Sequence, residues 1–197
     1  MSTSKLILFI GIILMSFTSV TATAKNDDGK NGEKVICRGF EAHTSGPMVK
    51  VGQSAPDFKA VNADLKEVCL SDFKGKRVIL NVFPSLDTPT CGLSVRQFNT
   101  KASELDNVVV LCLSMDLPFA QSRFCTTEGL HNVVPLSVFR SQDFMKGYGL
   151  RLADGPLEGL MARAVIVVDE NGKVVYTQLV DEISKEPDYD AALNAVE

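Results

Sequence analysis

Three runs of the chain consist almost entirely of valine, isoleucine and leucine, and they constrain the fold more than any other feature of the sequence. They are VILNVF (78–83), VVVLCLS (108–114) and RAVIVVD (163–169). Unbroken apolar runs of this length are typical of strands covered on both faces, whereas a sheet with one solvated face shows alternating polar residues. The sequence therefore predicts a sheet with helices above and below it.

A helix is predicted between the first two of these strands. Apolar residues recur there at spacings of four, three, four and three, at Cys91, Val95, Phe98, Ala102 and Leu105, and so share one helix face. A strand, a helix and a second strand of this length form a βαβ unit, which we expect to be right-handed. Cys91 lies on the inward face of the first turn of this helix.

Two hairpins are predicted before this unit, because short apolar runs are separated there by turn residues. The first pairs 35–42 with 48–51 around a turn at 43–47, and the second pairs 57–61 with 67–70. No internal repeat interrupts the pattern. We therefore expect extra strands on the N-terminal side of the βαβ unit.

The second half of the chain alternates between helix and strand signals. The expected elements are a helix over 116–130 that begins near Pro118, an edge strand over 132–139 that contains Pro135, a helix over 141–146 after the cap Ser141, a hairpin turn at 169–172 and a final helix over 187–196. This order indicates an α/β chain with a thioredoxin-like fold, in which helices flank a central mixed sheet and a β-hairpin extends the N-terminus.

The first 24 residues have the pattern of a secretory signal peptide. Lys5 precedes an apolar stretch from Leu6 to Phe17, and small residues at 22–24 form a cleavage site before Lys25. An uncleaved membrane anchor would require about 20 apolar residues, more than this stretch contains. We interpret 1–24 as a signal peptide, 25–34 as a flexible leader and 35–197 as one domain, and we expect an exported, periplasmic protein.

The composition of the chain argues against nucleic-acid binding, membrane binding and a metal site. Cleavage would leave 173 of the 197 residues and remove one positive charge, so the formal net charge would change from −4 to −5. A mildly acidic protein is a poor partner for nucleic acid or an anionic membrane. The two histidines and five cysteines show no spacing of a metal site, and we expect neither metal nor cofactor. An odd number of cysteines in an exported chain leaves at least one thiol free for chemistry.

Cys91 has the sequence context of a reactive thiol. The first turn of a helix presents unpaired N–H groups and the positive end of the helix dipole, which favour a thiolate. Pro84 and Pro89 stiffen the preceding loop, and Thr88 can donate a hydroxyl to the sulfur or to a bound oxygen atom. Cysteine is often simply buried, and we interpret Cys112, within VVVLCLS, in that way.

The residues around Cys91 exclude one common type of thiol chemistry. The tetrad is Cys91-Gly-Leu-Ser94, so the second thiol of a CxxC motif is replaced by a hydroxyl and dithiol exchange within the loop is impossible. A single activated thiolate can form mixed disulfides with a substrate, or it can attack the O–O bond of a peroxide and become a sulfenic acid. The residues alone leave both activities open.

Five segments of the chain resemble bacterial thiol peroxidases, the atypical two-cysteine branch of the peroxiredoxins. They are PSLDTPTC, SVRQFN, DLPFAQSRFC, ADGPLEGLMARAVIVVDENG and QLVDEISKEPDY. The resemblance runs from about Val35 to the C-terminus. It implies a peroxidase for hydroperoxides, organic ones in preference to hydrogen peroxide, with a thioredoxin or thioredoxin-like dithiol reductant and a homodimeric assembly.

The resemblance also assigns residues by position. It implies that Cys91 is the peroxidatic cysteine and that Cys125 is the resolving cysteine, with which it forms an intrachain redox disulfide. Pro84 and Thr88 complete the peroxide loop, and Arg163 holds the peroxide oxygens beside the sulfur. Arg96 and Arg123 are expected to be surface residues that form ion pairs.

The chain departs from this family at several positions, and other functions are compatible with the residues. Thr90 replaces a small aliphatic residue, Cys37 and Cys69 have no role in the family mechanism, and the signal peptide leaves the identity of the reductant open. The alternative enzyme is a monothiol disulfide-exchange protein, which would not need Cys125. A binding or holdase-like module that has lost its reductant is the non-enzymatic alternative.

Overall fold

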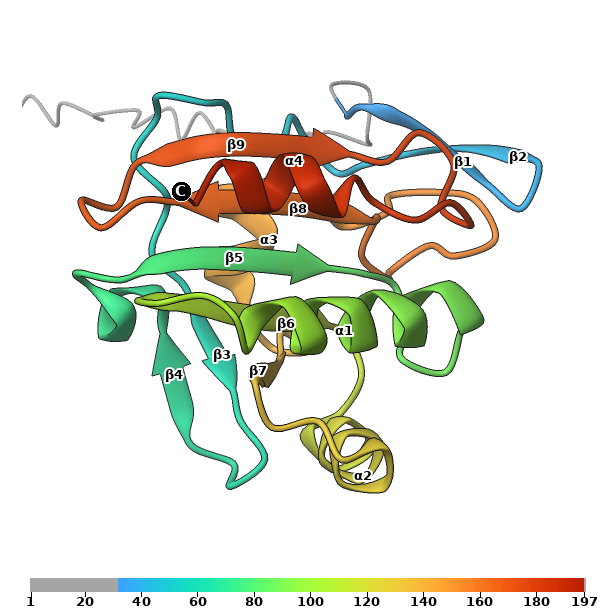
Figure 1. Cartoon of the computed structure of the whole chain (residues 1–197). Coiled ribbons are helices and arrows are strands. Elements are labelled where there is room, and N and C mark those ends of the chain that lie inside the picture. The colour runs from blue at the N-terminus through green and yellow to red at the C-terminus, as the bar shows by residue number, and fades with distance from the viewer. Residues whose placement is uncertain (1–31, 197) are drawn as a thin grey trace, which may run out of the picture.

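The computed structural model describes residues 32–196 and consists of a mixed β-sheet, a small hairpin and surrounding helices (Figure 1). The strands of the main sheet are β3 (Lys59–Val61), β4 (Glu67–Cys69), β5 (Arg77–Val82), β6 (Val108–Ser114), β7 (Val133–Ser137), β8 (Ala164–Val168) and β9 (Val174–Leu179). Their order across the sheet is β4-β3-β7-β6-β5-β8-β9. The central strands β5, β6 and β7 are parallel, whereas β8 pairs antiparallel with both β5 and β9. The predicted central mixed sheet is confirmed.

Both faces of the sheet are buried, as the apolar runs predict. Along β5, Val78, Leu80 and Val82 belong to one hydrophobic cluster, whereas Ile79, which points the opposite way, belongs to another. The residues of β8 divide between the same two clusters. Each central strand therefore stabilises two cores at once.

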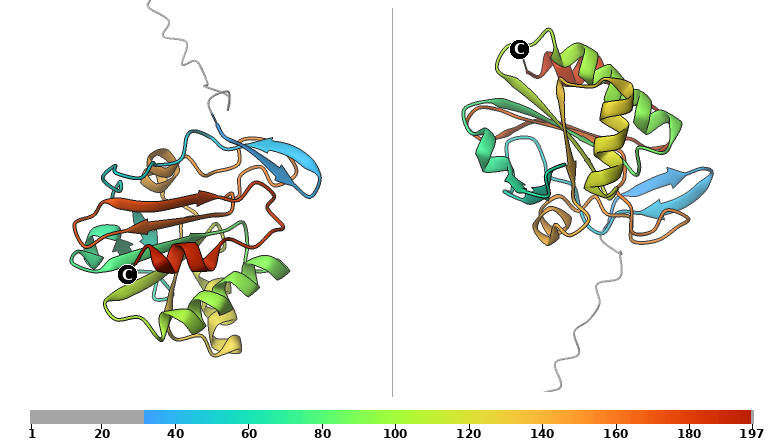
Figure 2. Two further views of the ribbon diagram at one scale, coloured as in Figure 1. Left: turned by 45° about the horizontal axis from the view of Figure 1, so that its top comes forward. Right: turned by 90° about the horizontal axis from the view of Figure 1, so that it is seen from below.

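Helices cover the two faces unequally (Figure 2). The helices are α1 (Pro89–Ala102), α2 (Pro118–Glu128), α3 (Gln142–Tyr148) and α4 (Tyr189–Asn194), and a 3₁₀ turn, η1 (Leu70–Phe73), follows β4. Helices α1 and α4 pack on one face through Phe98 and Ala192, and α2 adds Phe124 at its border. Helix α3 covers the other face through Phe144 and Tyr148. Leu105, expected within the helix of Cys91, lies beyond the end of α1 but still packs against its cluster.

The N-terminal hairpin is present, but its turn lies earlier than the sequence pattern indicated. Strands β1 (Lys34–Cys37) and β2 (Phe40–His43) pair antiparallel, so the turn is at Arg38-Gly39 and not at 43–47. Both turn residues have positive φ, 55° at Arg38 and 86° at Gly39, as a two-residue turn between twisted strands requires. The prediction failed because arginine is an unusual first residue for such a turn. Strand β1 begins at Lys34, the last residue of the expected leader.

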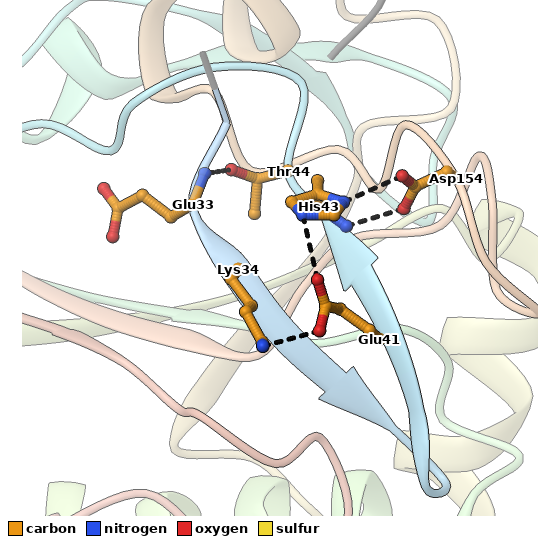
Figure 3. A network of polar contacts seen from close by, with 6 residues as sticks. All are labelled: Glu33, Lys34, Glu41, His43, Thr44 and Asp154. Atoms are coloured by element: carbon orange, nitrogen blue, oxygen red, sulfur yellow. Dashed lines mark hydrogen bonds and ion pairs between the residues drawn. The ribbon is translucent and has the colours of Figure 1, made fainter. Parts of the chain in front are cut away.

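Polar contacts fasten this hairpin to the rest of the domain (Figure 3). The Asp154 carboxylate accepts from the His43 backbone N–H at 2.6 Å and contacts the His43 Nδ1 at 2.9 Å. These bonds lower the pKa of Asp154 below its usual range. Lys34 and Glu41 form an ion pair across the two strands. The hairpin is therefore held against the loop that precedes β8.

Strand β7 lies inside the sheet, so the expectation of an edge strand at Pro135 was wrong. It pairs with β6 over five positions but meets β3 at only one, Val61 with Ser137. Pro135 is consequently tolerated, because the side of β7 that faces β3 has almost no ladder there. The second hairpin, β3 with β4, and the hairpin at Asp169–Gly172 form as predicted.

Helix α3 begins at the predicted cap, where the Ser141 hydroxyl accepts from the Phe144 N–H. It continues past Gly147, contrary to the sequence prediction, and ends at Gly149 in the left-handed conformation. Residues 1–24 and most of the leader lie outside the described residues. Within 32–196, no helix is long and apolar enough to cross a membrane.

A matched pair of glycines tests how α3 is held. Gly129 and Gly149 both end helices with φ near 65°, but a Cβ at Gly129 would meet nothing, whereas one at Gly149 would lie 2.5 Å from the Pro47 carbonyl oxygen. We expect Gly129→Ala to lower the free energy of unfolding by about 1–2 kcal/mol. We expect Gly149→Ala to lower it by clearly more, because backbone atoms must move. Urea unfolding measures both, and equal losses would contradict the close approach.

Candidate active site

Cys91 lies in the first turn of α1, directly after the loop that leaves the carboxyl end of β5. Thr88 is the N-cap residue and Pro89 occupies the first helical position, so Cys91 is the third residue of the helix. The N–H of this position belongs to the group of donors that has no partner within a helix. Burial of the side chain is complete, since Cys91 is 0% exposed.

Thr88 occupies the N-cap position of α1, but its side chain does not make the usual capping bond. An N-cap hydroxyl ordinarily accepts from the backbone N–H of the second or third helical residue, but Thr88 makes no such bond. Its Oγ1 lies instead 2.7 Å from the Cys91 sulfur and 3.1 Å from the Ser85 carbonyl oxygen. The Thr88 hydroxyl therefore contacts the thiol of Cys91 and does not cap the helix.

The two contacts of Thr88 depend on the protonation of Cys91, because a hydroxyl has one proton. When Cys91 is a thiol, the hydroxyl can donate to the Ser85 carbonyl and accept from the S–H group. When Cys91 is a thiolate, the hydroxyl must turn and donate to the sulfur. The Ser85 carbonyl then keeps the Thr88 backbone N–H as a donor, at 3.1 Å, so it is not left unpaired.

Arg163 contacts the same sulfur from the start of β8. It immediately precedes β8, and β8 pairs antiparallel with β5 such that Ala164 lies opposite Val82. The start of β8 therefore meets the end of β5. The Arg163 Nη2 lies 3.3 Å from the Cys91 sulfur, and its Nε donates to the Ile183 carbonyl oxygen at 3.0 Å.

The guanidinium of Arg163 retains unused hydrogen-bonding capacity. The side chain is 1% exposed, and its Nη1 is buried without a hydrogen-bond partner. A buried N–H group without an acceptor is destabilising by about 1–3 kcal/mol. Such a group indicates that a ligand atom completes the site, and an oxygen atom next to the Cys91 sulfur would do so.

A pocket of about 410 Å³ leads to these groups. Its lining comes from the loop before α1, the hairpin turn, the loop before β8 and the segment after β9: Arg38, Pro84, Asp87, Thr88, Pro89, Thr90, Leu157, Arg163, Ile183 and Ser184. Pro84 and Thr88, both expected at the site, are thus brought together with Arg163. The pocket combines donors near the sulfur with an apolar wall, which suits a small organic molecule that carries an electrophilic oxygen.

Cys125 lies on α2 and forms no disulfide with Cys91. All five cysteines are free thiols in this structure. It is 8% exposed, and burial raises its pKa. Its helix packs beside α1: a Cβ at Gly92 would lie 3.4 Å from the Phe124 ring, and Arg96 forms a two-pronged ion pair with Glu128 at 2.9 Å. The expected ion pair of Arg96 is confirmed.

The other cysteines are separate from the pocket. Cys112 is buried beside Asn81, and burial raises its pKa to about 12, which agrees with a structural role. Cys37 is buried in β1 and Cys69 is partly exposed in β4, and burial raises the pKa of each. The Thr90 hydroxyl donates to the Ser184 carbonyl at 3.0 Å and joins α1 to the segment after β9.

Residues 32–196 contain no cluster of three or more metal-binding side chains. No sequence motif points to Asp116 or Ser85, although Ser85 lies within the loop before α1 and Asp116 contacts that loop. The Ser85 hydroxyl donates to the Asp116 carboxylate at 2.7 Å, and the Leu86 N–H donates to it at 2.8 Å. Their only signal in the sequence is a polar residue just after each central strand.

Comparison with known proteins identifies the family of the chain. Residues 50–193 match the family model described as Redoxin. The chain is 57% identical to a thiol peroxidase of Corynebacterium glutamicum over 83% of this chain and 98% of that protein. A thiol peroxidase of Mycobacterium bovis is 48% identical over the same shares of both chains.

A solved structure gives the same result for the fold. A peroxiredoxin-like protein from Aquifex aeolicus superposes with a TM-score of 0.79 at 40% identity, over 84% of this chain and 97% of that one. This likeness confirms the predicted thioredoxin-like peroxiredoxin fold. The chain belongs to the Redoxin family and, within it, to the thiol peroxidases of the peroxiredoxin branch.

Proposed function

We propose that this thiol peroxidase reduces organic hydroperoxides with Cys91 as the attacking group. The Cys91 thiolate would attack the terminal oxygen of the O–O bond, which breaks and releases the alcohol after its oxygen takes up a proton. Cys91 is thereby oxidised to a sulfenic acid. The apolar wall of the pocket supports an organic substrate, although hydrogen peroxide is small enough to enter as well.

The observation that carries this proposal is the arrangement of donors around one buried sulfur. Thr88 Oγ1 and Arg163 Nη2 contact the sulfur at 2.7 and 3.3 Å, and Arg163 Nη1 has no partner. Arg163 can therefore stabilise the thiolate with one arm and the leaving oxygen with the other. Preorganised donors that face developing charge are commonly the largest contribution to enzymatic rate enhancement.

Cys125 is the proposed resolving residue. Its thiol would attack the sulfenic sulfur of Cys91, water would leave, and a disulfide would form within one chain. Both thiols are buried on separate helices, so the first turn of α1 and the segment 122–129 of α2 must first unwind. Unwinding would also expose Cys125 and remove the burial that raises its pKa, which favours its attacking thiolate form.

A dithiol of the thioredoxin type would restore the two thiols by exchange with the disulfide. The proposed signal peptide places this cycle outside the cytoplasm, where the reductant would be an exported thioredoxin-like protein. The proposed assembly is a homodimer, on the basis of the family resemblance. None of these assignments requires a metal or a bound cofactor.

Substitutions at the sulfur and its cation test the proposed chemistry. Cys91→Ser is expected to abolish consumption of cumene hydroperoxide. Arg163→Met, which keeps the side-chain volume without the charge, should lower the second-order rate constant by at least about 100-fold, in line with the loss of a preorganised donor. Arg163→Lys should lie between Arg163→Met and wild type.

Stopped-flow mixing measures these rates, and thermal melting confirms that each variant folds. Arg123→Met is the matched control, because Arg123 is an exposed arginine on α2. An unchanged rate constant in Arg163→Met would show that the guanidinium has no role in the reaction. Full activity of Cys91→Ser would show that Cys91 is not the attacking group.

One equivalent of hydroperoxide should convert the reduced protein to a Cys91–Cys125 disulfide. Non-reducing peptide mapping identifies the linkage, and hydrogen exchange should increase in residues 88–92 and 122–129 because both must unwind. Below the ordinary thiol pKa of about 8.5, the rate of disulfide formation should rise with pH as more Cys125 ionises. A linkage to Cys37 or Cys69, or between two chains, is the contradictory outcome.

Export is tested separately in the organism that produces the protein. Cell fractionation should recover the protein outside the cytoplasm, and mass analysis should find a chain that begins at or near Lys25. The apolar stretch Leu6–Phe17 and the small residues at 22–24 motivate this expectation. Recovery of the full-length chain from the cytoplasm would contradict it.

A further inference from the structure

A chain of directed hydrogen bonds connects the helix of Cys125 to the loop before Cys91. Gln121 Nε2 donates to Ser114 Oγ at 3.0 Å, and the Ser114 hydroxyl donates to Asp116 Oδ2 at 2.8 Å. The Asp116 carboxylate also accepts from the Ser85 hydroxyl and from the Leu86 N–H. The carboxylate is thus the acceptor at which the bonds from the helix and from the loop converge.

The number of protons on each group determines which group donates in each of these hydrogen bonds. Asp116 is an acceptor only, so Ser114 must use its one proton toward it and must accept from Gln121. The second Nε2 proton of Gln121 goes to the Leu136 carbonyl oxygen of β7 at 3.1 Å. Gln121 is 1% exposed and Ser114 is 0% exposed, so water does not readily replace these partners.

The two ends of the network adjoin the two segments that the proposed disulfide requires to move. Gln121 precedes Cys125 by one helical turn and lies on the same face of α2. Ser85 precedes Cys91 in the loop, and the Thr88 N–H and hydroxyl both contact its carbonyl oxygen. Movement of the helix at Gln121 would break its bond to Ser114, and movement of the loop at Ser85 would break the bonds to Asp116.

We propose that Asp116 is a positioning residue that couples the Cys91 loop to the Cys125 helix and so sets how readily the two segments open together. This inference rests on the proposed disulfide between Cys91 and Cys125. With the network intact, the loop holds Thr88 against the sulfur while peroxide reacts. Opening disconnects both arms, and the sulfenic acid of Cys91 can then reach Cys125.

The network would thereby decide between two fates of the sulfenic acid. In the closed form, a second hydroperoxide can oxidise the sulfenic acid of Cys91 to a sulfinic acid with release of a second alcohol. In the open form, the Cys125 thiol condenses with it and water leaves. Weakening the network should favour the disulfide and raise the hydroperoxide concentration that is needed for sulfinic acid formation.

The experiment removes each arm separately and then both. Ser85→Ala weakens the loop arm, because it removes the side-chain bond to Asp116 and leaves only the Leu86 N–H bond, and Gln121→Met removes the helix arm at nearly constant volume. Tyr148→Phe is the control, because it deletes one hydrogen bond, to the Pro56 carbonyl at 2.8 Å, within the cluster of α3. Intact-protein mass spectrometry after reaction with increasing cumene hydroperoxide gives the fractions of disulfide and of sulfinic acid.

Gln121→Met removes the bonds to Ser114 and to the Leu136 carbonyl, and we expect it to raise the hydroperoxide concentration for half-conversion to sulfinic acid at least about fivefold, since the loss of one neutral hydrogen bond alone predicts a change of that size. Ser85→Ala should act in the same direction. The double variant should show no more than the Gln121→Met effect, because that substitution already disconnects the helix from Asp116. Tyr148→Phe should leave the concentration unchanged, although it lowers overall stability.

Two results would overturn the coupling. One is a double variant in which the two single effects multiply, which means that the arms act independently. The other is a Tyr148→Phe control that shifts the partition as much as Gln121→Met, which means that any loss of stability suffices. If the wild-type protein forms no Cys91–Cys125 disulfide, the proposed resolving step is wrong. If the wild type forms the disulfide but the variants show the same partition between disulfide and sulfinic acid as the wild type, only the role of Asp116 is wrong.

Discussion

The antiparallel pairing of β8 with β5 is the constraint on which the site depends. The pairing of Ala164 with Val82 brings the residue before β8 to the end of β5, where the loop to α1 begins. Arg163 and Cys91 are 72 residues apart in sequence but meet at 3.3 Å because of this register. A shift of one residue would send every side chain of β8 to the opposite face. The burial of both faces of β8 in two clusters therefore also fixes the distance between Arg163 and Cys91 in the candidate site.

Burial of a guanidinium without a carboxylate needs compensation. Within residues 32–196, the hydrogen-bond partners of Arg163 are the Ile183 carbonyl and the Cys91 sulfur, and no carboxylate forms an ion pair with it. A buried charge is strongly unfavourable unless it is paired. In the proposed mechanism, a thiolate at Cys91 would supply the negative charge that Arg163 lacks, and the Arg163 guanidinium would in turn stabilise that charge.

The two cysteine helices lie on one side of the sheet but are held by different contacts. On the surface, Arg96 of α1 pairs with Glu128 of α2, and exposed pairs of this kind contribute little to stability. The bonds that Gln121 donates to Ser114 and to the Leu136 carbonyl are buried, and the bonds to the Asp116 carboxylate are partly buried. The proposed opening of the two segments would therefore depend more on this polar network than on the exposed ion pair between the helices.

The sequence by itself determined the central strands and the helix of Cys91, because apolar periodicity and proline or capping residues act within a few positions of the chain. It misplaced the turn of the first hairpin at 43–47 and assigned β7 to the edge. Pairing between strands decides that an arginine adopts a left-handed turn, and it also decides that β3 joins β7 at a single position. Arg163 was found only through family resemblance, and Asp116 was not found at all. Their positions depend on strand order and register, which bring together groups that no local pattern connects, and only the tertiary structure decides them.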